Sequence, residues 1–525
     1  MFNRVKNALY NVVGGLDALP AVRDGEAPGD GDKLPLKFKY TRPSFLQLTT
    51  DDEVQVSADH VIRPIIVPRD ISKIPWNAGY AETINAGKSL RNEDQAAVYR
   101  GAVRRGAHGD GAELPWVYFA LFDGHAGSGV AVAASNVLQR VLQDKLMSVM
   151  ELLVPDGGVQ ASAPEGGFLP FGDRKITADS LVIGALETAF WDMDQQIARD
   201  KKHYKMTGGC TVLVALFILG KLYLANAGDS RAIICRGEQV IPMSCDFTPE
   251  TERSRIKHLG MQCPELLGSE FTHLEFVRRP VRADLGKRLL CRDAFMTGWN
   301  HCLYASSELV LIWFKHIMNS ALRALQSRVL ATIGVTRGFG DHDLKAQSSN
   351  VDIKPFLTPE PEVRIFDVCG EELTDGDVLV MGTDGLWDVL PNDRAAQIVL
   401  KSLDHFPASD TQRFKFRYIS AAQDLVMHSR GKLKERSWRT VDNRAATIDD
   451  ISVFVIPLRG YQDEHRAWMA TTRQQSEPQV QPQPQSQPQL QPLPQPQSQP
   501  PARTSSSPQL SSPPQPQPQP PADAS

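Results

Sequence analysis

The sequence lacks the features that mark a secreted, lipid-anchored or membrane-spanning protein. Its seven cysteines are odd in number and form no CxxC pair, so we expect a reducing compartment and no disulfide framework. The first residues are too polar between their apolar positions for a signal peptide, and Phe2 stands where N-myristoylation requires glycine. The most apolar window, Leu309–Phe314, lies between two charged residues and is too short to span a bilayer. We therefore expect a cytoplasmic protein.

A strong charge bias and a glycine-rich phosphate loop are also missing. The net charge is −4 and no long basic stripe occurs, so the sequence lacks the electrostatic footprint of a nucleic-acid-binding protein. Short apolar strands joined by tight turns, at Gly220-Lys221 and Gly237-Glu238, indicate antiparallel sheets rather than a doubly wound nucleotide-binding fold. Two long amphipathic patterns, from Val130 to about Leu153 and from Leu181 to Ile197, predict helices laid over those sheets. The predicted fold class is α+β.

Composition divides the 525 residues into three predicted parts. Residues 1–75 are expected to hold an amphipathic helix and an extended arm, and residues 76–457 the folded domain. Residues 458–525 are predicted to be a disordered tail. Of the 37 prolines, 16 follow Glu477 in an alternation with Gln and Ser, which buries too little apolar surface to offset the entropy of ordering.

Residues 2–16 place apolar side chains on one face of a short predicted helix. A membrane-surface anchor and a helix docked on the folded domain, or merely frayed, both fit this pattern. Only two cations, Arg4 and Lys6, support the anchor, so we favour the second interpretation.

The stretch Trp116–Gly127 organises the rest of the chain. An almost wholly apolar run, typical of a strand buried on both faces, stops at Asp123 and is followed by Gly124 and His125. A carboxylate and an imidazole two residues apart at the end of a strand suit a metal site with a nearby proton donor. The alternative is that Asp123 is a helix N-cap and His125 an incidental loop residue.

Similar acidic corners occur elsewhere in the chain, which favours the metal site. Together with Asp123, they are Glu93-Asp94, Asp229, Asp384 and Asp449. Unpaired carboxylates at the ends of buried strands repel one another unless a cation lies among them. Oxygen ligands without clusters of His or Cys indicate Mg²⁺ or Mn²⁺ rather than zinc.

Seven motifs now resemble, in order, those of the metal-dependent (PPM, type 2C) protein serine/threonine phosphatases. They are Asn92–Asp94, Phe122–Gly127, Gly208–Thr211, Asn226–Arg231, Thr336–Asp341, Thr383–Asp388 and Asp449–Ser452. The resemblance covers about residues 76–457. Three further stretches resemble the H/J/M subgroup of that family: Arg42–Leu46, Ile84–Ser89 and Glu270–Phe276.

The resemblance implies a four-layer α-β-β-α sandwich with two central antiparallel sheets and a site for two Mg²⁺ or Mn²⁺ ions. In that family's pattern Asp123 would bridge the two ions, Gly124 would bind through its carbonyl, and Asp384 and Asp449 would complete one shell. Glu93 would act through water, and Asp229 with Asp384 matches a weaker third metal position.

The same resemblance implies the reaction. Phosphoserine and phosphothreonine in proteins would be hydrolysed by a water that two metal ions activate, without a covalent intermediate. Asp94 would position the attacking water, and His125 would be the general acid for the leaving alkoxide.

The sequence departs from the family in two places. Many members carry a phosphate-binding arginine where this chain has Ser89, so Lys88 or Arg91 is expected to take over that contact. The predicted flap insert, about residues 245–331, contains an unusually apolar run at 300–326. A partner-binding helix and a gene-model error both explain this run, and we slightly favour the error.

A pseudophosphatase scaffold, which would bind partners through the same fold, is the alternative function. The intact carboxylate set argues against it, because a scaffold has no need of mutually repelling acids. Small GTPases of the Rab type are candidate substrates by analogy with the subgroup alone.

Overall fold

The computed structural model describes residues 37–104, 113–153, 176–263, 288–292, 299–303, 328–329, 332–345 and 351–476. The predicted helix at residues 2–16 and the Pro/Gln/Ser-rich segment after Glu477 lie outside these residues. So does most of the predicted flap insert, including nearly all of the apolar run at 300–326.

Two five-stranded antiparallel sheets form the centre of the domain. One has the order β1 (Gly79–Thr83), β17 (Ile451–Pro457), β14 (Val378–Gly382), β8 (Arg231–Arg236) and β9 (Gln239–Pro242). The other has the order β13 (Glu362–Asp367), β7 (Lys221–Ala227), β6 (Val212–Ile218), β3 (Glu113–Phe122) and β2 (Gln95–Arg104). Every neighbouring pair of strands in both sheets is antiparallel, as the tight turns predicted.

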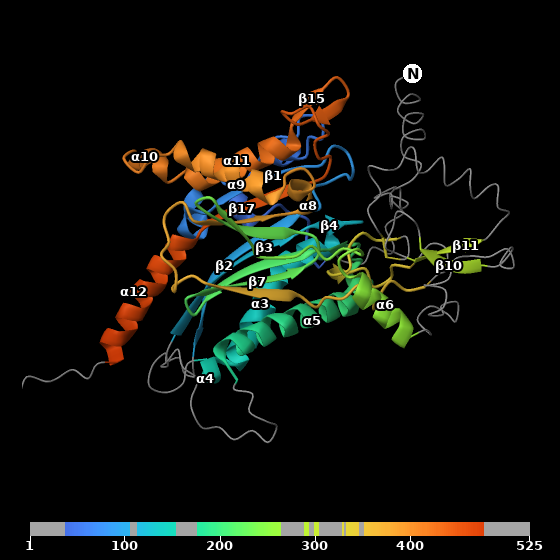
Figure 1. Cartoon of the computed structure of the whole chain (residues 1–525), viewed down its shortest axis with the longest axis horizontal. Coiled ribbons are helices and arrows are strands. Elements are labelled where there is room, and N and C mark those ends of the chain that lie inside the picture. Colours follow the sequence, from blue (N-terminus) through green and yellow to red (C-terminus); the bar gives the residue numbers. More distant parts are fainter. Residues whose placement is uncertain are drawn as a thin grey trace, which may run out of the picture. The chain divides into compact units, whose positions relative to one another are not determined.

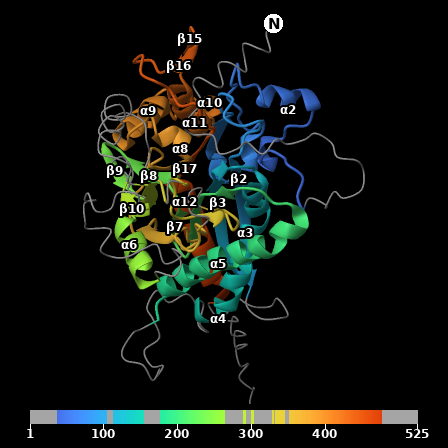
Figure 2. The same cartoon turned by 90° about the vertical axis from the view of Figure 1, so that its right-hand side faces the viewer.

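Helices cover the outer face of each sheet. On the β3-containing sheet lie α3 (Gly129–Ser148) and α5 (Ala178–Tyr204), with α4 (Met150–Leu153) following α3. On the β17-containing sheet lie α9 (Asn392–Asp404) and α11 (Arg417–Arg430). Figures 1 and 2 show the two helix layers on opposite sides of the stacked sheets. The predicted α+β class and four-layer sandwich are confirmed.

Strand β3 contributes to two hydrophobic cores at once. Because side chains alternate along a strand, one set faces the helices and the other faces the second sheet. The first set packs with α3 and α5 and consists of Trp116, Tyr118, Ala120 and Phe122. The second set packs between the sheets and consists of Val117, Phe119 and Leu121. All seven side chains are buried, which confirms the prediction of a strand buried on both faces.

A small three-stranded sheet continues from the end of β3. It has the order β12 (Phe339–Gly340), β5 (Gly209–Cys210) and β4 (Gly124–His125). The register places His125 opposite Gly209, and Gly209 opposite Gly340. Segments more than 200 residues apart in the sequence therefore meet beside Asp123.

The remaining described elements lie outside the two large sheets. They are η1 (Ser44–Leu46), α2 (Asp51–Ser57), η2 (Ile71–Lys73), η3 (Pro75–Asn77), α6 (Arg253–Gln262), β10 (Arg288–Arg292), β11 (Trp299–Leu303), α8 (Asp384–Trp387), α10 (Thr411–Phe414), β15 (Lys432–Lys434), β16 (Ser437–Arg439) and α12 (Leu458–Ser476). Among the described helices, none combines the length and the apolar character needed to cross a membrane.

The predicted start of the folded domain at residue 76 is too late. Phe45 and Leu46 are buried in the core between the sheets, and Thr50 caps α2 through a capping box with Glu53. Residues 37–75 thus belong to the same folded body. The prediction missed this because the buried residues of the arm are few and follow no helical or strand period.

The predicted start of the tail at residue 458 is too early. Helix α12 runs from Leu458 to Ser476, and it buries Leu458, Tyr461 and Gln462. The Gln462 amide donates hydrogen bonds to the carbonyls of Val368 and Glu371, both at 2.7 Å. Most of the helix is polar, and its narrow apolar stripe was too weak to predict a docked helix.

Candidate active site

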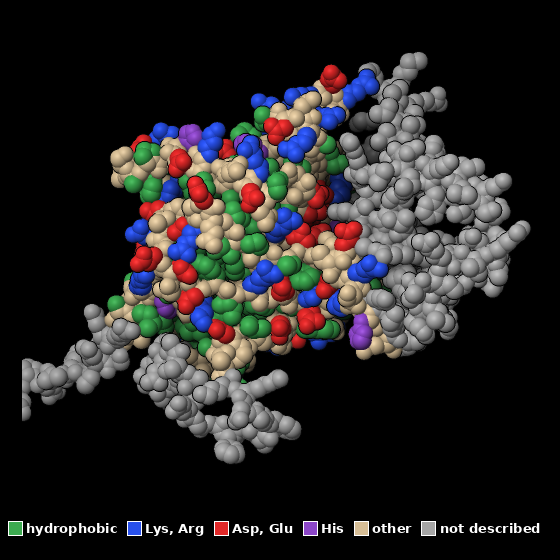
Figure 3. Space-filling model, viewed as in Figure 1, with side chains coloured by type: hydrophobic (Ala, Val, Ile, Leu, Met, Phe, Trp, Pro, Cys, Tyr) green, Lys and Arg blue, Asp and Glu red, His purple; other side chains and the backbone are tan. Residues whose placement is uncertain are grey.

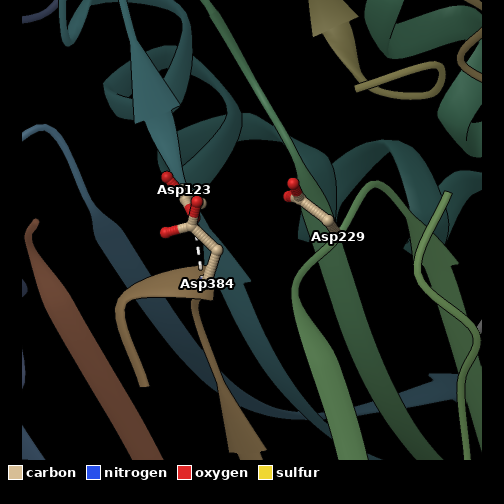
Figure 4. A group of neighbouring side chains, drawn as sticks. All are labelled: Asp123, Asp229 and Asp384. Atoms are coloured by element: carbon tan, nitrogen blue, oxygen red, sulfur yellow. Dashed lines mark hydrogen bonds between the residues drawn. The ribbon is translucent and has the colours of Figure 1, made fainter. Parts of the chain in front are cut away.

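Three aspartates meet where the two large sheets end. Asp123 directly follows β3, Asp229 lies between β7 and β8, and Asp384 begins α8 after β14. One oxygen of each carboxylate lies within 4.8 Å of the others, and Figure 4 shows the three side chains converging. The Asp384 backbone N–H donates to Asp123 Oδ2 at 3.2 Å. Asp123 is not a helix cap, because α3 begins at Gly129 and Ser128 occupies its N-cap position.

The electrostatics of this cluster favour a bound cation. Burial, followed by repulsion from neighbouring acids, raises the pKa of Asp123 and Asp384 well above the usual range. Burial raises the pKa of Asp229 to about 7, with Asp246 and Asp388 adding to the effect. In Figure 3 acidic side chains gather on the right of the described surface, at the end of the sheets where Figure 1 places β4 and α8. Three converging carboxylate oxygens are a donor set suited to Mg²⁺ or Mn²⁺.

Lys88 is the predicted phosphate contact that lies at this cluster. Its ammonium forms an ion pair with Asp449 Oδ2. Burial by itself would lower the pKa of Lys88, but Asp449 and Asp384 outweigh it and raise the pKa. Arg91 lies differently: its guanidinium stacks over the ring of Tyr40, 4.9 Å from the centroid. The geometry therefore favours Lys88 over Arg91 for a contact with a bound phosphate.

Glu93 packs directly against the turn that carries Asp123. Its Oε1 accepts a hydrogen bond from the Gly127 N–H at 2.8 Å, although burial raises its pKa. A Cβ on Gly124 would lie 2.3 Å from the Glu93 carbonyl oxygen, so only glycine allows this approach. The Gly124 backbone thus lies beside Glu93, as expected if the two residues belong to one metal site.

Asp94 is fully buried beneath the cluster. Its Oδ2 accepts a hydrogen bond at 2.9 Å from the hydroxyl of Thr383, the residue that precedes Asp384. Burial, followed by the nearby Asp450 carboxylate, raises the pKa of Asp94 well above its usual value. Arg42 in the N-terminal arm donates to the Asp94 carbonyl at 2.6 Å and pairs with Glu82.

His125 has a partner to which the sequence analysis assigned no role. Its Nε2 lies 2.8 Å from Asp341 Oδ2. Burial alone would lower the pKa of His125, but Asp341 outweighs it, with Glu93 and Asp229 adding, and the pKa is raised. Asp341 was visible in the motif Thr336–Asp341, but nothing in the sequence linked it to His125.

Two more residues that the sequence analysis gave no role support the loops that carry Glu93 and Asp449. The Asp450 carboxylate accepts the Glu93 N–H at 3.0 Å and the Asn85 N–H at 2.7 Å, and burial raises its pKa to about 7. Arg63 is fully buried and donates to the carbonyls of Ile84, Thr447 and Asp449. Asp450 stood in a quoted motif, whereas no pattern marked Arg63.

The chain is similar to known proteins over most of its length. The family model described as Protein phosphatase 2C matches residues 92–276 and 316–426. Protein phosphatase 1H of Homo sapiens is 44% identical over 520 residues, covering 87% of this chain and 99% of that protein. Protein phosphatase 1J of Homo sapiens is 44% identical over 463 residues, covering 82% of this chain and 89% of that protein.

One solved structure, a serine-threonine phosphatase 2C from Toxoplasma gondii, covers 75% of this chain and 99% of its own, with a TM-score of 0.39 and 15% identity. That TM-score is too low to support an argument.

Proposed function

This chain belongs to the protein phosphatase 2C family and is a protein phosphatase, and on that premise we propose that it hydrolyses phosphoserine and phosphothreonine with Mg²⁺ or Mn²⁺. The observation that carries the proposal is the convergence of Asp123, Asp229 and Asp384, whose oxygens lie within 4.8 Å of one another. Carboxylates held this close cannot all remain ionised unless cations lie among them.

The residues proposed to hold two divalent ions lie just before or just after the central strands. Asp123 would contact both ions, and the Gly124 carbonyl, Asp384, Asp449 and Glu93 would complete the two shells. Asp229 would serve a weaker third position. When bound, such ions supply an activated water and offset the charge of the phosphoryl oxygens.

Two residues of the chain would act on the water and the phosphate. Asp94 would orient the attacking water through its buried carboxylate. Lys88 would bind a phosphate oxygen, because its ammonium already lies at the edge of the carboxylate cluster. Lys88 would thereby take the place of the arginine that Ser89 replaces.

His125 would give a proton to the leaving serine or threonine oxygen. Its Nε2 is engaged by Asp341, so Nδ1 is the ring nitrogen left to donate. The P–O bond to the side chain breaks as the attacking water oxygen bonds to phosphorus, and this water releases one proton to the solvent, from which His125 regains the proton that it gives away. The leaving oxygen keeps the electron pair and takes the proton, which gives the free hydroxyl group without a covalent intermediate.

The test is release of phosphate from a phosphothreonine peptide by the full chain. We expect turnover with Mn²⁺, none with EDTA, and a loss of at least about 100-fold in Asp384→Ala. Asp404→Asn, an exposed aspartate at the end of α9, is the matched control and should retain full turnover. Turnover that survives EDTA would refute the metal mechanism. A folded chain without turnover would favour the pseudophosphatase alternative.

Substrate and location are proposed from the sequence alone. Phosphoproteins are the substrate class, and Rab-type small GTPases are the candidates to test first. We propose a cytoplasmic location, with residues 2–16 as the segment to test for peripheral contact with membranes. Fractionation of cells that express the full chain or a variant without residues 2–16 would test the cytoplasmic location and the membrane contact.

A further inference from the structure

Helix α5 carries a buried acid that the proposed mechanism does not use. Asp194 is 1% exposed, and its carboxylate contacts the backbone of Gly340 in β12. Phe190, one helical turn earlier on the same face, packs edge-on against Phe339 at a ring distance of 5.3 Å. Asp194 therefore lies on the side of α5 that holds this segment.

The Asp194 carboxylate binds the backbone next to Asp341. Its Oδ1 accepts the Gly340 N–H at 2.9 Å. Gly340 and Asp341 both have positive φ angles, +85° and +54°. A left-handed conformation is unfavourable for a residue other than glycine, so Asp341 keeps it only where the surroundings hold it.

Lys354 and His342 compensate the buried negative charge of the Asp194 carboxylate. Lys354 Nζ lies 2.5 Å from Asp194 Oδ2, and His342 Nε2 lies 3.1 Å from Oδ1. Burial alone would raise the pKa of Asp194, but His342 and Lys354 outweigh it and lower the pKa. Asp194 is thus an ionised acceptor, which binds an N–H group more strongly than a neutral one.

We propose that Asp194 is a positioning residue: by holding the Gly340 N–H, it aims the Asp341 carboxylate at His125 and so orients the general acid. The inference rests on the proposed function, because it concerns the proton that His125 gives to the leaving alkoxide. The chain of contacts runs from Asp194 through Gly340 and Asp341 to His125, without a residue proposed to bind metal.

The nature of the leaving group separates positioning of the acid from a general loss of structure. A phosphothreonine peptide releases an alkoxide, which needs a proton. The aryl substrate p-nitrophenyl phosphate releases a stable phenolate, which does not. A misplaced acid therefore slows the first reaction much more than the second.

We expect Asp194→Ala to lower kcat on the peptide about 10- to 100-fold and kcat on the aryl phosphate less than about threefold. His125→Ala should show the same selectivity, and the double variant should lose little beyond His125→Ala alone. Affinity for Mn²⁺, measured by calorimetry, should stay at the wild-type value. Asp192→Asn, an ion-paired aspartate on the exposed side of α5, is the matched control and should change neither rate.

Lys354→Met separates positioning from stability. It removes the cation of Asp194 but leaves the bond to Gly340, so we expect lower thermal stability with a wild-type ratio of the two rates. If Asp194→Ala alone does not fold, Asp194→Ala combined with Lys354→Met decides, because it removes the acceptor of the Gly340 N–H together with the cation that would otherwise be left unpaired. We expect the ratio of the two rates in this double variant to shift at least about threefold in the same direction.

Two results would overturn the inference. One is an equal loss of kcat on both substrates in a folded Asp194 variant, which leaves the ratio of the two rates unchanged. The other is additive losses in the double variant of Asp194 and His125. These outcomes differ from a failure of the proposed function, in which the wild-type chain itself would turn over neither substrate or would keep its activity in EDTA.

Discussion

Gly209 lies directly beneath the contact between His125 and Asp341, and replacing it by alanine should break that contact. A Cβ at this position would lie 2.1 Å from Asp341 Oδ2 and 2.7 Å from His125 Nε2. Carbon and oxygen rarely approach closer than about 3.3 Å, so the carboxylate must retreat by roughly 1 Å. The Nε2 and Oδ2 atoms are now 2.8 Å apart, and this retreat would move them beyond the range of a hydrogen bond.

The magnitude follows from the kind of bond that is lost. A hydrogen bond to a charged group contributes about 1.5–3 kcal/mol, which corresponds to about 10- to 150-fold in rate. We expect Gly209→Ala to lower kcat on a phosphothreonine peptide by this factor and kcat on p-nitrophenyl phosphate much less.

Gly184→Ala is the matched control for this substitution. Gly184 lies in α5, and a Cβ there would meet no atom within 4 Å. Alanine in the helix should stabilise the protein by about 0.5–1 kcal/mol and leave both rates unchanged. A Gly209→Ala variant that folds and retains wild-type turnover of the peptide would refute the role assigned to the pair.

Three other predictions concern stability. Arg42→Met leaves the buried Glu82 carboxylate without its cation and should cost about 3–5 kcal/mol in urea unfolding, most of which Arg42→Met with Glu82→Gln should recover; equal losses in both variants would contradict this. Burial alone would raise the pKa of Glu252, but Arg337 and Arg255 outweigh it, so its pKa is lowered from 4.5 and its stabilisation is lost as pH falls below that value. Glu252→Gln should therefore be less stable than wild type at pH 7, with a difference that shrinks as the pH falls below about 4; a difference independent of pH would contradict this. Mn²⁺ at about 100 times its dissociation constant should raise the free energy of unfolding by about 2.7 kcal/mol, and Asp384→Ala should abolish most of this rise in thermal melts.

The sequence predicted the parts of the site that lie at the ends of buried strands. Asp123 and Asp384 follow apolar runs whose length and burial are set by the core, so the position of each carboxylate follows from where the run stops. The α+β class followed in the same way, from strand patterns, tight turns and two amphipathic helices, whereas the four-layer sandwich came from the resemblance to the phosphatase family.

The supporting contacts could not be predicted in this way. His125 and Asp341 are 216 residues apart, and their pairing depends on three two-residue strands and a positive φ angle, none of which leaves a periodic pattern. Arg63 is buried through hydrogen bonds to carbonyl oxygens, which any sequence supplies. Such contacts become visible only when the backbone is placed.

The placement of Arg42 and of α12 bears on how this enzyme can be shortened. A fragment cut at residues 76 and 457 would keep every proposed metal ligand but would lose the guanidinium that holds the Asp94 carbonyl. It would also uncover the core positions that Phe45 and Tyr461 fill. A fragment expected to sustain catalysis therefore has to keep the arm from residue 37 and helix α12 together with the two sheets.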